Sequence, residues 1–150
     1  MAHKISGIVT SFKYTGELKN TQLLADFFFI PLRSSDENLR DYPIAPFREL
    51  NNKILRIIKD LSFHGKTAWI ETDFFIEGTQ HALTFENGVK TLGPLVSFHG
   101  IDPVESSSYM LSVGAINQTL EFLGVKRSIN QDEFDLLRLG EWRSNNDFYL

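Results

Sequence analysis

Apolar residues recur at helical spacing in two parts of the chain. From Phe47 to Leu61 they return every three or four positions, which is typical of a helix with one buried face. The segment from Tyr109 to Leu123 has the same spacing, and Gly124 follows it as a residue type that commonly ends helices. These patterns predict helices near residues 47–63 and 107–123.

The C-terminal part of the chain contains a shorter pattern. Asn130–Glu133 resembles a capping box, which predicts a short third helix that ends at Gly140. The tail from Glu141 to Leu150 is rich in aromatic side chains. Because aromatic side chains bury large apolar surfaces, we expect this tail to dock on the rest of the molecule.

Period-two alternation between Gly and Pro boundaries predicts a sheet. The expected strands cover residues 4–14, 24–32, 66–77, 79–86, 89–92 and, as a last short strand, 95–98. Asn87-Gly88 predicts a tight hairpin turn, because both central residues of such a turn need positive φ. With residues 89–98 written as one optional strand, the order β-β-α-β-β-(β)-α-α predicts one α+β domain over residues 1–150. In this domain a single, mainly antiparallel sheet carries the helices on one face.

The alternation in residues 66–77 places aromatic and acidic side chains on one face of that strand. The residues on this face are Trp69, Glu71, Asp73, Phe75 and Glu77. One interpretation is an exposed surface on which an aromatic side chain anchors a partner and the carboxylates steer it. The other interpretation is that Trp69 and Phe75 lie under a helix or under the C-terminal tail. The pattern alone leaves both open.

Composition narrows the classes of protein that fit. The chain has 150 residues, of which 42% are hydrophobic and 23% charged, as expected of one globular domain. It has no cysteine, which excludes disulfides, a thiol nucleophile and cysteine-ligated zinc. The longest uncharged apolar run, Phe27–Leu32, is too short to span a membrane, and the N-terminus has no secretory pattern. We therefore expect a cytoplasmic protein with no membrane partner.

Charge is distributed unevenly along the chain. The formal net charge of −4 argues against a protein that binds nucleic acid directly. Residues 67–88 contain four acidic residues and no Lys or Arg, whereas residues 46–66 contain five basic and two acidic ones. An acidic hairpin of this kind is complementary to a basic partner.

Few residues are candidates for catalysis. No two of the four histidines have the i, i+4 spacing of a helical metal site, and no glycine-rich nucleotide-binding motif occurs. We therefore expect no metal and no cofactor. Glu71 and Asp73 lie two residues apart on one strand face, close enough for a general acid and a general base. A small hydrolase that uses these carboxylates with a nearby histidine such as His81 is the alternative function.

Short segments in the second half of the chain resemble a known family. They are Trp69-Ile-Glu-Thr-Asp-Phe-Phe75, Gly78-Thr-Gln80, Glu86-Asn-Gly88, Gly93-Pro94, Ile116-Asn-Gln-Thr-Leu-Glu-Phe-Leu-Gly124, Asp132-Glu-Phe-Asp135, Leu139-Gly140 and Arg143-Ser-Asn145. Together they resemble the cognate immunity proteins encoded beside bacterial polymorphic toxins, including those of contact-dependent growth inhibition systems. The similarity covers residues 66–148, and the first half of the chain adds only Phe28–Leu32.

The resemblance implies a cytosolic protein that is not an enzyme and that binds and neutralises one toxin domain, often a nuclease. Nucleases hold polyanions, so a positive cleft of the toxin would accept a carboxylate-rich surface as a phosphate mimic. We therefore expect the partner to be the basic C-terminal domain of a cognate toxin. The expected contact residues are Trp69, Glu71, Asp73, Phe75 and Glu77, with Trp69 or Phe75 as the anchor.

Overall fold

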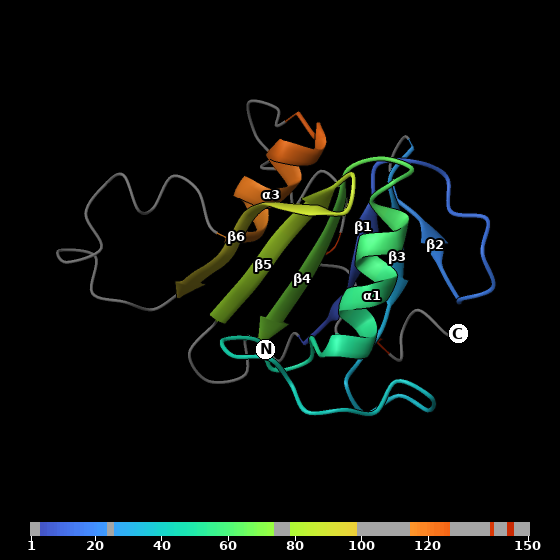
Figure 1. Ribbon diagram of the computed structural model, residues 1–150. Coiled ribbons are helices and arrows are strands. Elements are labelled where there is room, and N and C mark those ends of the chain that lie inside the picture. Colours follow the sequence, from blue (N-terminus) through green and yellow to red (C-terminus); the bar gives the residue numbers. More distant parts are fainter. Residues whose placement is uncertain are drawn as a thin grey trace, which may run out of the picture.

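The computed structural model of the protein describes residues 4–23, 26–73, 79–98, 115–126, 139, 144 and 145 (Figure 1). Its elements in chain order are β1 (Ser6–Thr10), β2 (Thr21–Gln22), β3 (Phe28–Pro31), α1 (Asn52–Leu61), β4 (Thr67–Asp73), β5 (Thr79–Glu86), β6 (Val89–Phe98) and α3 (Ala115–Leu123). No helix in this part of the chain is long and apolar enough to cross a membrane.

The six strands form one antiparallel sheet in the order β2-β3-β1-β4-β5-β6. The predicted α+β class and the antiparallel sheet are therefore confirmed. The predicted order of elements is wrong, because the described chain runs β-β-β-α-β-β-β-α. β1 and β4 lie at the centre of the sheet, so the N-terminal strand pairs with a strand from the middle of the chain.

Two strands differ from the predicted ones, and the predicted third helix lies outside the described residues. The sequence pattern does not predict β2, which precedes the expected second strand and pairs with Phe28 and Phe29 of β3. β6 runs through Gly93-Pro94, where the pattern predicts a break between two short strands. Because β6 lies at the edge of the sheet, a proline there removes no hydrogen bond from the sheet interior. A register irregularity near Thr84 of β5 accommodates the continuous strand.

α1 begins later than its apolar spacing predicts. Asn51 is the N-cap, and its side-chain oxygen accepts a hydrogen bond from the backbone N–H of Ile54 at 2.9 Å. The backbone N–H groups of residues 48–50 donate to the carboxylate of Glu71. These contacts hold the segment outside the helix, so the expected start near residue 47 is wrong.

The two helices pack on opposite faces of the sheet and create two apolar layers (Figure 1). The layer under α1 includes Ile8, Trp69, Leu83, Ile54 and Ile58. The layer under α3 includes Val9, Ile70, Ala82, Ile116 and Leu120. Successive residues of a strand point to opposite faces, so the central strands are buried on both sides. The expectation that the helices share one face is wrong.

This arrangement decides between the two interpretations of Trp69. The alternation predicted along residues 66–73 is confirmed, since Trp69 and Ile70 belong to different layers. Trp69 is 0% exposed, and it packs in the layer under α1. The interpretation that it lies under a helix is therefore confirmed, and the expectation of an exposed anchor at Trp69 is wrong. Alternation identifies the two faces of a strand, but it does not tell which face a distant helix covers.

Much of the predicted helical structure near the C-terminus lies outside the described residues. Within the expected helix 107–123, residues 115–123 form α3, and Gly124 follows with a φ of +106°, as predicted for a helix end. The third helix expected after Asn130 and most of the tail lie outside the described residues. At Asn145, the expected docking of the tail is confirmed, because this side chain is buried against β1.

Candidate functional site

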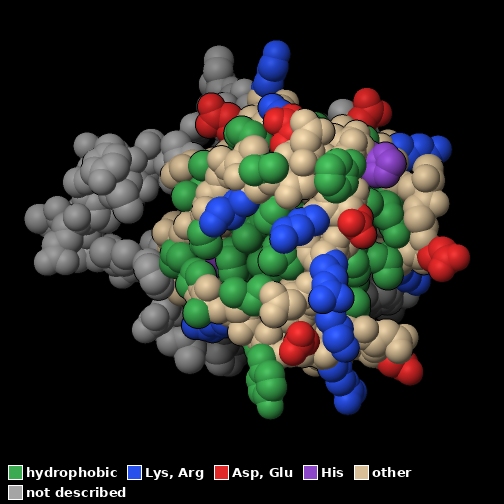
Figure 2. Space-filling view, in the orientation of Figure 1, with side chains coloured by type: hydrophobic (Ala, Val, Ile, Leu, Met, Phe, Trp, Pro, Cys, Tyr) green, Lys and Arg blue, Asp and Glu red, His purple; other side chains and the backbone are tan. Residues whose placement is uncertain are grey.

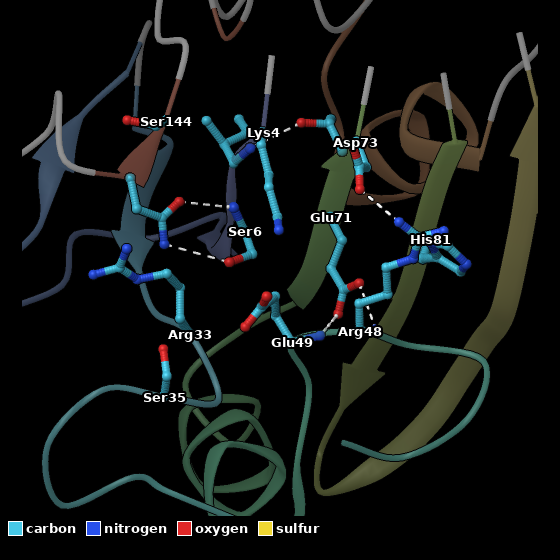
Figure 3. Close-up of a pocket in the computed structure, with 13 residues that line it drawn as sticks. Lys4, Ser6, Arg33, Ser35, Arg48, Glu49, Glu71, Asp73, His81 and Ser144 are labelled. Atoms are coloured by element: carbon cyan, nitrogen blue, oxygen red, sulfur yellow. Dashed lines mark hydrogen bonds and ion pairs between the residues drawn. The ribbon is translucent and has the colours of Figure 1, made fainter. Parts of the chain in front are cut away.

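A polar cavity of about 240 Å³ lies at one end of the sheet, where β1 begins and β4 ends (Figure 3). The segment between β3 and α1, the first half of β5 and two residues of the C-terminal tail complete its wall. The charged and titratable residues that line it are Lys4, Arg33, Arg48, Glu49, Glu71, Asp73 and His81. The fold therefore brings ionisable side chains from distant parts of the chain to one place.

Glu71 is the most constrained group in the cavity. It is 4% exposed, and its carboxylate accepts four hydrogen bonds. The backbone N–H groups of Arg48, Glu49 and Leu50 donate at 2.9, 2.8 and 3.0 Å, and the indole N–H of Trp69 donates at 3.0 Å. Hydrogen bonds from backbone N–H groups to a carboxylate are charge-assisted and therefore strong. Glu71 thus fastens the segment before α1 to β4.

Asp73 is paired within the molecule. Its Oδ2 lies 2.5 Å from Nη1 of Arg48, and the two side chains are 19% and 56% exposed. Arg48 belongs to the basic segment 46–66, so segments of opposite charge meet at this point. A partly exposed ion pair of this kind stabilises a fold by about 1 kcal/mol or less. Its larger consequence is that Asp73 is not an isolated negative charge.

His81 lies on β5 directly opposite Glu71 in the pairing of β4 with β5. It is 7% exposed, and the centre of its ring lies 6.0 Å from that of Phe47. Neither of its ring nitrogens has a hydrogen-bond partner among the described residues. Burial lowers the pKa of His81 below its ordinary value of 6.5; Glu71 and Asp73 oppose this shift, and Arg48 reinforces it. The imidazole is therefore neutral at pH 7.

Two further cations line the cavity. Nε of Arg33 lies 3.2 Å from Oδ1 of Asp36, three residues along the chain. The Lys4 side chain extends into the cavity (Figure 3), and no described residue forms an ion pair with it. Lys4 is thus a positive charge that the described part of the fold does not neutralise.

The C-terminal tail closes one side of the cavity through Asn145, which is 2% exposed. Its Oδ1 accepts a hydrogen bond from the backbone N–H of Ser6 at 2.8 Å. Its Nδ2 donates to the hydroxyl of Ser6 at 3.3 Å and to the carbonyl of Leu32 at 3.2 Å. These contacts tie the tail to β1 and to the end of β3, so the cavity wall includes both ends of the chain.

The structure separates the five residues that the sequence predicts at a partner surface. Trp69 and Glu71 are buried, and neither presents a surface to a partner in this conformation. Asp73 is partly exposed and paired with Arg48. Phe75 and Glu77 lie outside the described residues. The expected exposure is therefore wrong for Trp69 and Glu71, because α1 and the segment before it cover them, and partner binding stays a prediction for all five residues.

The residues of the alternative, hydrolytic site do meet, since Glu71, Asp73 and His81 line one cavity. General acid–base catalysis needs a base that is free to take a proton and a neighbour that orients it. The carboxylate of Glu71 is occupied by four N–H donors, and no hydrogen bond joins it to His81. Among the described residues, no three His, Asp or Glu side chains are placed to hold a metal ion. The carboxylate of Glu71 is therefore not free to act as a base in this arrangement.

Sequence reasoning misses Lys4, Arg33 and Arg48, because the pattern within each of their segments does not show that the three segments meet at one cavity. The signal that points to this site is the spacing of Trp69 and Glu71. On a strand buried on both faces, a carboxylate next to an indole must be matched by donors, because an unpaired buried charge is costly. The indole N–H supplies one of these donors. The other three donors are backbone N–H groups of residues 48–50. The period-two pattern of β4 does not show which loop will supply them.

No protein-family model, no curated protein and no solved structure matches this chain.

Proposed function

We propose that this chain is a cytoplasmic, immunity-type protein that binds a cognate toxin domain and neutralises it by a non-catalytic contact. The resemblance of residues 66–148 to immunity proteins supports the proposal. The observation that carries it is a cluster of large apolar side chains exposed around the C-terminal end of α1. The state of Glu71 weighs against hydrolysis, because its carboxylate is already bound by protein donors.

Phe63 and Val89 are the centre of this cluster, and each is 63% exposed. The turn after α1 carries Phe63 over the hairpin between β5 and β6, where a Cβ on Gly88 would lie 2.5 Å from the ring. The backbone N–H groups of Asn87 and Gly88 donate to the carbonyl and the hydroxyl of Ser62, at 2.9 and 2.8 Å. These bonds hold the hairpin tip in place and leave two apolar side chains in solvent.

A groove of about 450 Å³ lies beside the same turn, with Leu61 and His64 in its lining. Phe12, Tyr14, Leu61 and His64 line it, and the rings of Phe12 and His64 are 6.1 Å apart. We call Phe63, Val89 and the residues of this groove the Phe63 surface. Exposed apolar clusters beside a groove are typical of protein-binding surfaces, and aromatic side chains often contribute most of the binding energy there.

Basic side chains surround the apolar part of this face. Lys53, Arg56 and Lys59 are exposed on α1 together with one acidic residue, Asp60, and Lys90 is exposed on β6. Figure 2 shows hydrophobic side chains gathered over β5 and β6 beside α1, with Lys and Arg side chains and fewer Asp and Glu side chains around them. The complementary partner surface is apolar with an acidic rim. This partner surface differs from the basic one that the sequence predicts. That prediction needs an exposed carboxylate at Glu71.

Growth rescue tests the proposed function. The C-terminal domain encoded by the reading frame directly upstream is expressed from an inducible promoter, with and without this chain. We expect the domain to arrest growth, co-expression to restore it, and the two proteins to co-purify. The proposal fails if the upstream domain is harmless, or if this chain neither restores growth nor binds it.

The Phe63 surface is tested separately by substitution. Phe63→Ser is expected to weaken toxin binding about thirtyfold, measured by titration calorimetry, because losing an aromatic anchor typically costs about 2 kcal/mol. Tyr42→Ser is the matched control, since Tyr42 is 88% exposed but precedes Pro43, which forms a bridge with Asn51 at the N-terminal end of α1. Both variants should keep the free energy of unfolding within about 0.5 kcal/mol. Equal affinities for the two variants would place the interface elsewhere.

A further inference from the structure

The carboxylates that line the cavity at the end of the sheet are already bound by groups of the protein. Glu71 accepts four hydrogen bonds, and Asp73 pairs with Arg48. Oε1 of Glu49 accepts hydrogen bonds from the backbone N–H and the hydroxyl of Ser34, at 3.1 and 3.0 Å. The fold therefore uses the acidic groups of the cavity for its own structure.

In contrast, several hydrogen-bond donors that line the cavity have no acceptor among the described residues. Lys4 extends into the cavity without an ion pair to any described residue, and Arg33 uses only its Nε, for Asp36. His81 is 7% exposed and lines the same cavity, and neither ring nitrogen is hydrogen-bonded within the described part of the chain. The ring nitrogens are not among the fully buried, unpartnered atoms of the described residues, so they are accessible from the cavity. An imidazole without a protein partner at a cavity wall is available to a ligand.

We propose that this cavity binds a small carboxylate, whose oxygens accept hydrogen bonds from the ammonium group of Lys4, the guanidinium group of Arg33 and the imidazole of His81. A neutral imidazole offers one N–H donor, and the two cations offer charge-assisted donors. The site lies at the end of α1 opposite to the Phe63 surface, and it does not depend on the proposed toxin binding.

The charges of the lining select the class of ligand. Three basic and three acidic residues line the cavity, and among the described residues Lys4 is the basic one without an acidic partner. One negative charge on the ligand pairs with this cation, whereas a phosphate dianion would bring a second negative charge next to the carboxylates of a lining that is neutral overall. A divalent cation would be repelled by the three basic groups of the lining. The volume of about 240 Å³ suits a small metabolite, since pockets for larger ligands are typically 300–1,000 Å³.

Nuclear magnetic resonance on the full chain tests the site. Protein labelled with nitrogen-15 is titrated at pH 7 and constant ionic strength with acetate, with succinate and with inorganic phosphate, and the imidazole resonances of His81 are followed. We expect at least one of the two carboxylates to shift these resonances with saturation and to bind more tightly than phosphate. Lys4→Gln should weaken this binding at least tenfold. Lys13→Gln is the matched control, because Lys13 lines the groove at the other end of α1.

Three results would overturn this proposal. The first is a shift that never saturates and that sodium chloride reproduces, which would mean a general salt effect. The second is equal weakening by Lys4→Gln and Lys13→Gln, with the amide spectrum of both variants showing an intact fold. The third is tighter binding of phosphate than of either carboxylate, which would reject the ligand class. None of these results depends on whether the chain binds a toxin.

Discussion

The two ends of α1 are attached to the rest of the molecule in different ways. Before its N-terminal end, the buried carboxylate of Glu71 binds three backbone N–H groups and the indole of Trp69. At its C-terminal end, Ser62 binds the tip of the β5–β6 hairpin through two hydrogen bonds, and Phe63 lies exposed above Gly88. The first junction is polar and buried, and the second is apolar and open to solvent.

This difference separates groups that hold the fold together from groups left for contacts with other molecules. A buried carboxylate with four donors stabilises the fold only as a complete set, because removing it leaves donors unpaired. An exposed aromatic ring contributes little to the fold, since much of its surface stays in water until another molecule covers it. Substitutions at the two ends should therefore change different quantities: stability at the polar end, and binding at the apolar end.

The largest effect is expected at Glu71. Glu71→Gln removes the negative charge and turns an amide NH₂ group toward N–H donors, so we expect the free energy of unfolding to fall by about 3 kcal/mol in urea denaturation. Glu86→Gln is the matched control on the neighbouring strand, at a half-buried position, and should change stability by about 0.5 kcal/mol or less. If Glu71→Gln lowers the free energy of unfolding no more than the control does, the junction at Glu71 contributes little to stability.

A smaller loss of stability is expected from a substitution at the C-terminal end of α1. Ser62→Ala removes the hydroxyl that accepts from the backbone N–H of Gly88, while the bond from Asn87 to the carbonyl of Ser62 remains. One hydrogen bond of this kind typically contributes about 1 kcal/mol. Ser35→Ala, at an exposed position, is the control for loss of a hydroxyl. If Ser62→Ala destabilises as much as Glu71→Gln in the same urea experiment, the contrast between the two ends is wrong.

Features with a local signal are predictable from the sequence. Asn87 and Gly88 have φ values of 54° and 76°, as the predicted hairpin turn requires. The apolar spacing likewise identifies both described helices. It places the start of α1 too early, because the spacing continues through residues 47–50. Only the tertiary contact with Glu71 shows that this segment is not helical.

Features that depend on distant segments are not predictable in this way. The face of β4 that carries Trp69 is buried because α1 packs over it, and nothing in the alternation of β4 indicates which face a helix will cover. The cavity combines Lys4, Arg33 and His81 from three separate strands or strand ends. The sequence does suggest that Glu71, Asp73 and a histidine meet, since two of them share a strand face. It does not show that Glu71 is already occupied.

The smallest effect concerns the dependence of stability on pH through His81, at the polar end. In the unfolded chain this ring titrates near 6.5, whereas burial lowers its pKa in the fold; Glu71 and Asp73 oppose that shift, and Arg48 reinforces it. Above the unfolded value both states are neutral, and His81 adds no pH dependence. As the pH falls below 6.5, the unfolded chain binds a proton that the folded chain does not. The free energy of unfolding must therefore decrease.

His81→Gln removes this difference in proton uptake, so the decrease between pH 7 and pH 5 should be shallower than in the unsubstituted protein. Urea denaturation at a series of pH values measures the slope. His64→Gln is the matched control, because His64 is exposed and lies in the groove at the apolar end. A charge on His81 would have to enter a cavity that already holds Arg48, and no described residue hydrogen-bonds to the ring. If the slope is unchanged in His81→Gln, or changes equally in both variants, the burial of His81 does not cause this dependence of stability on pH.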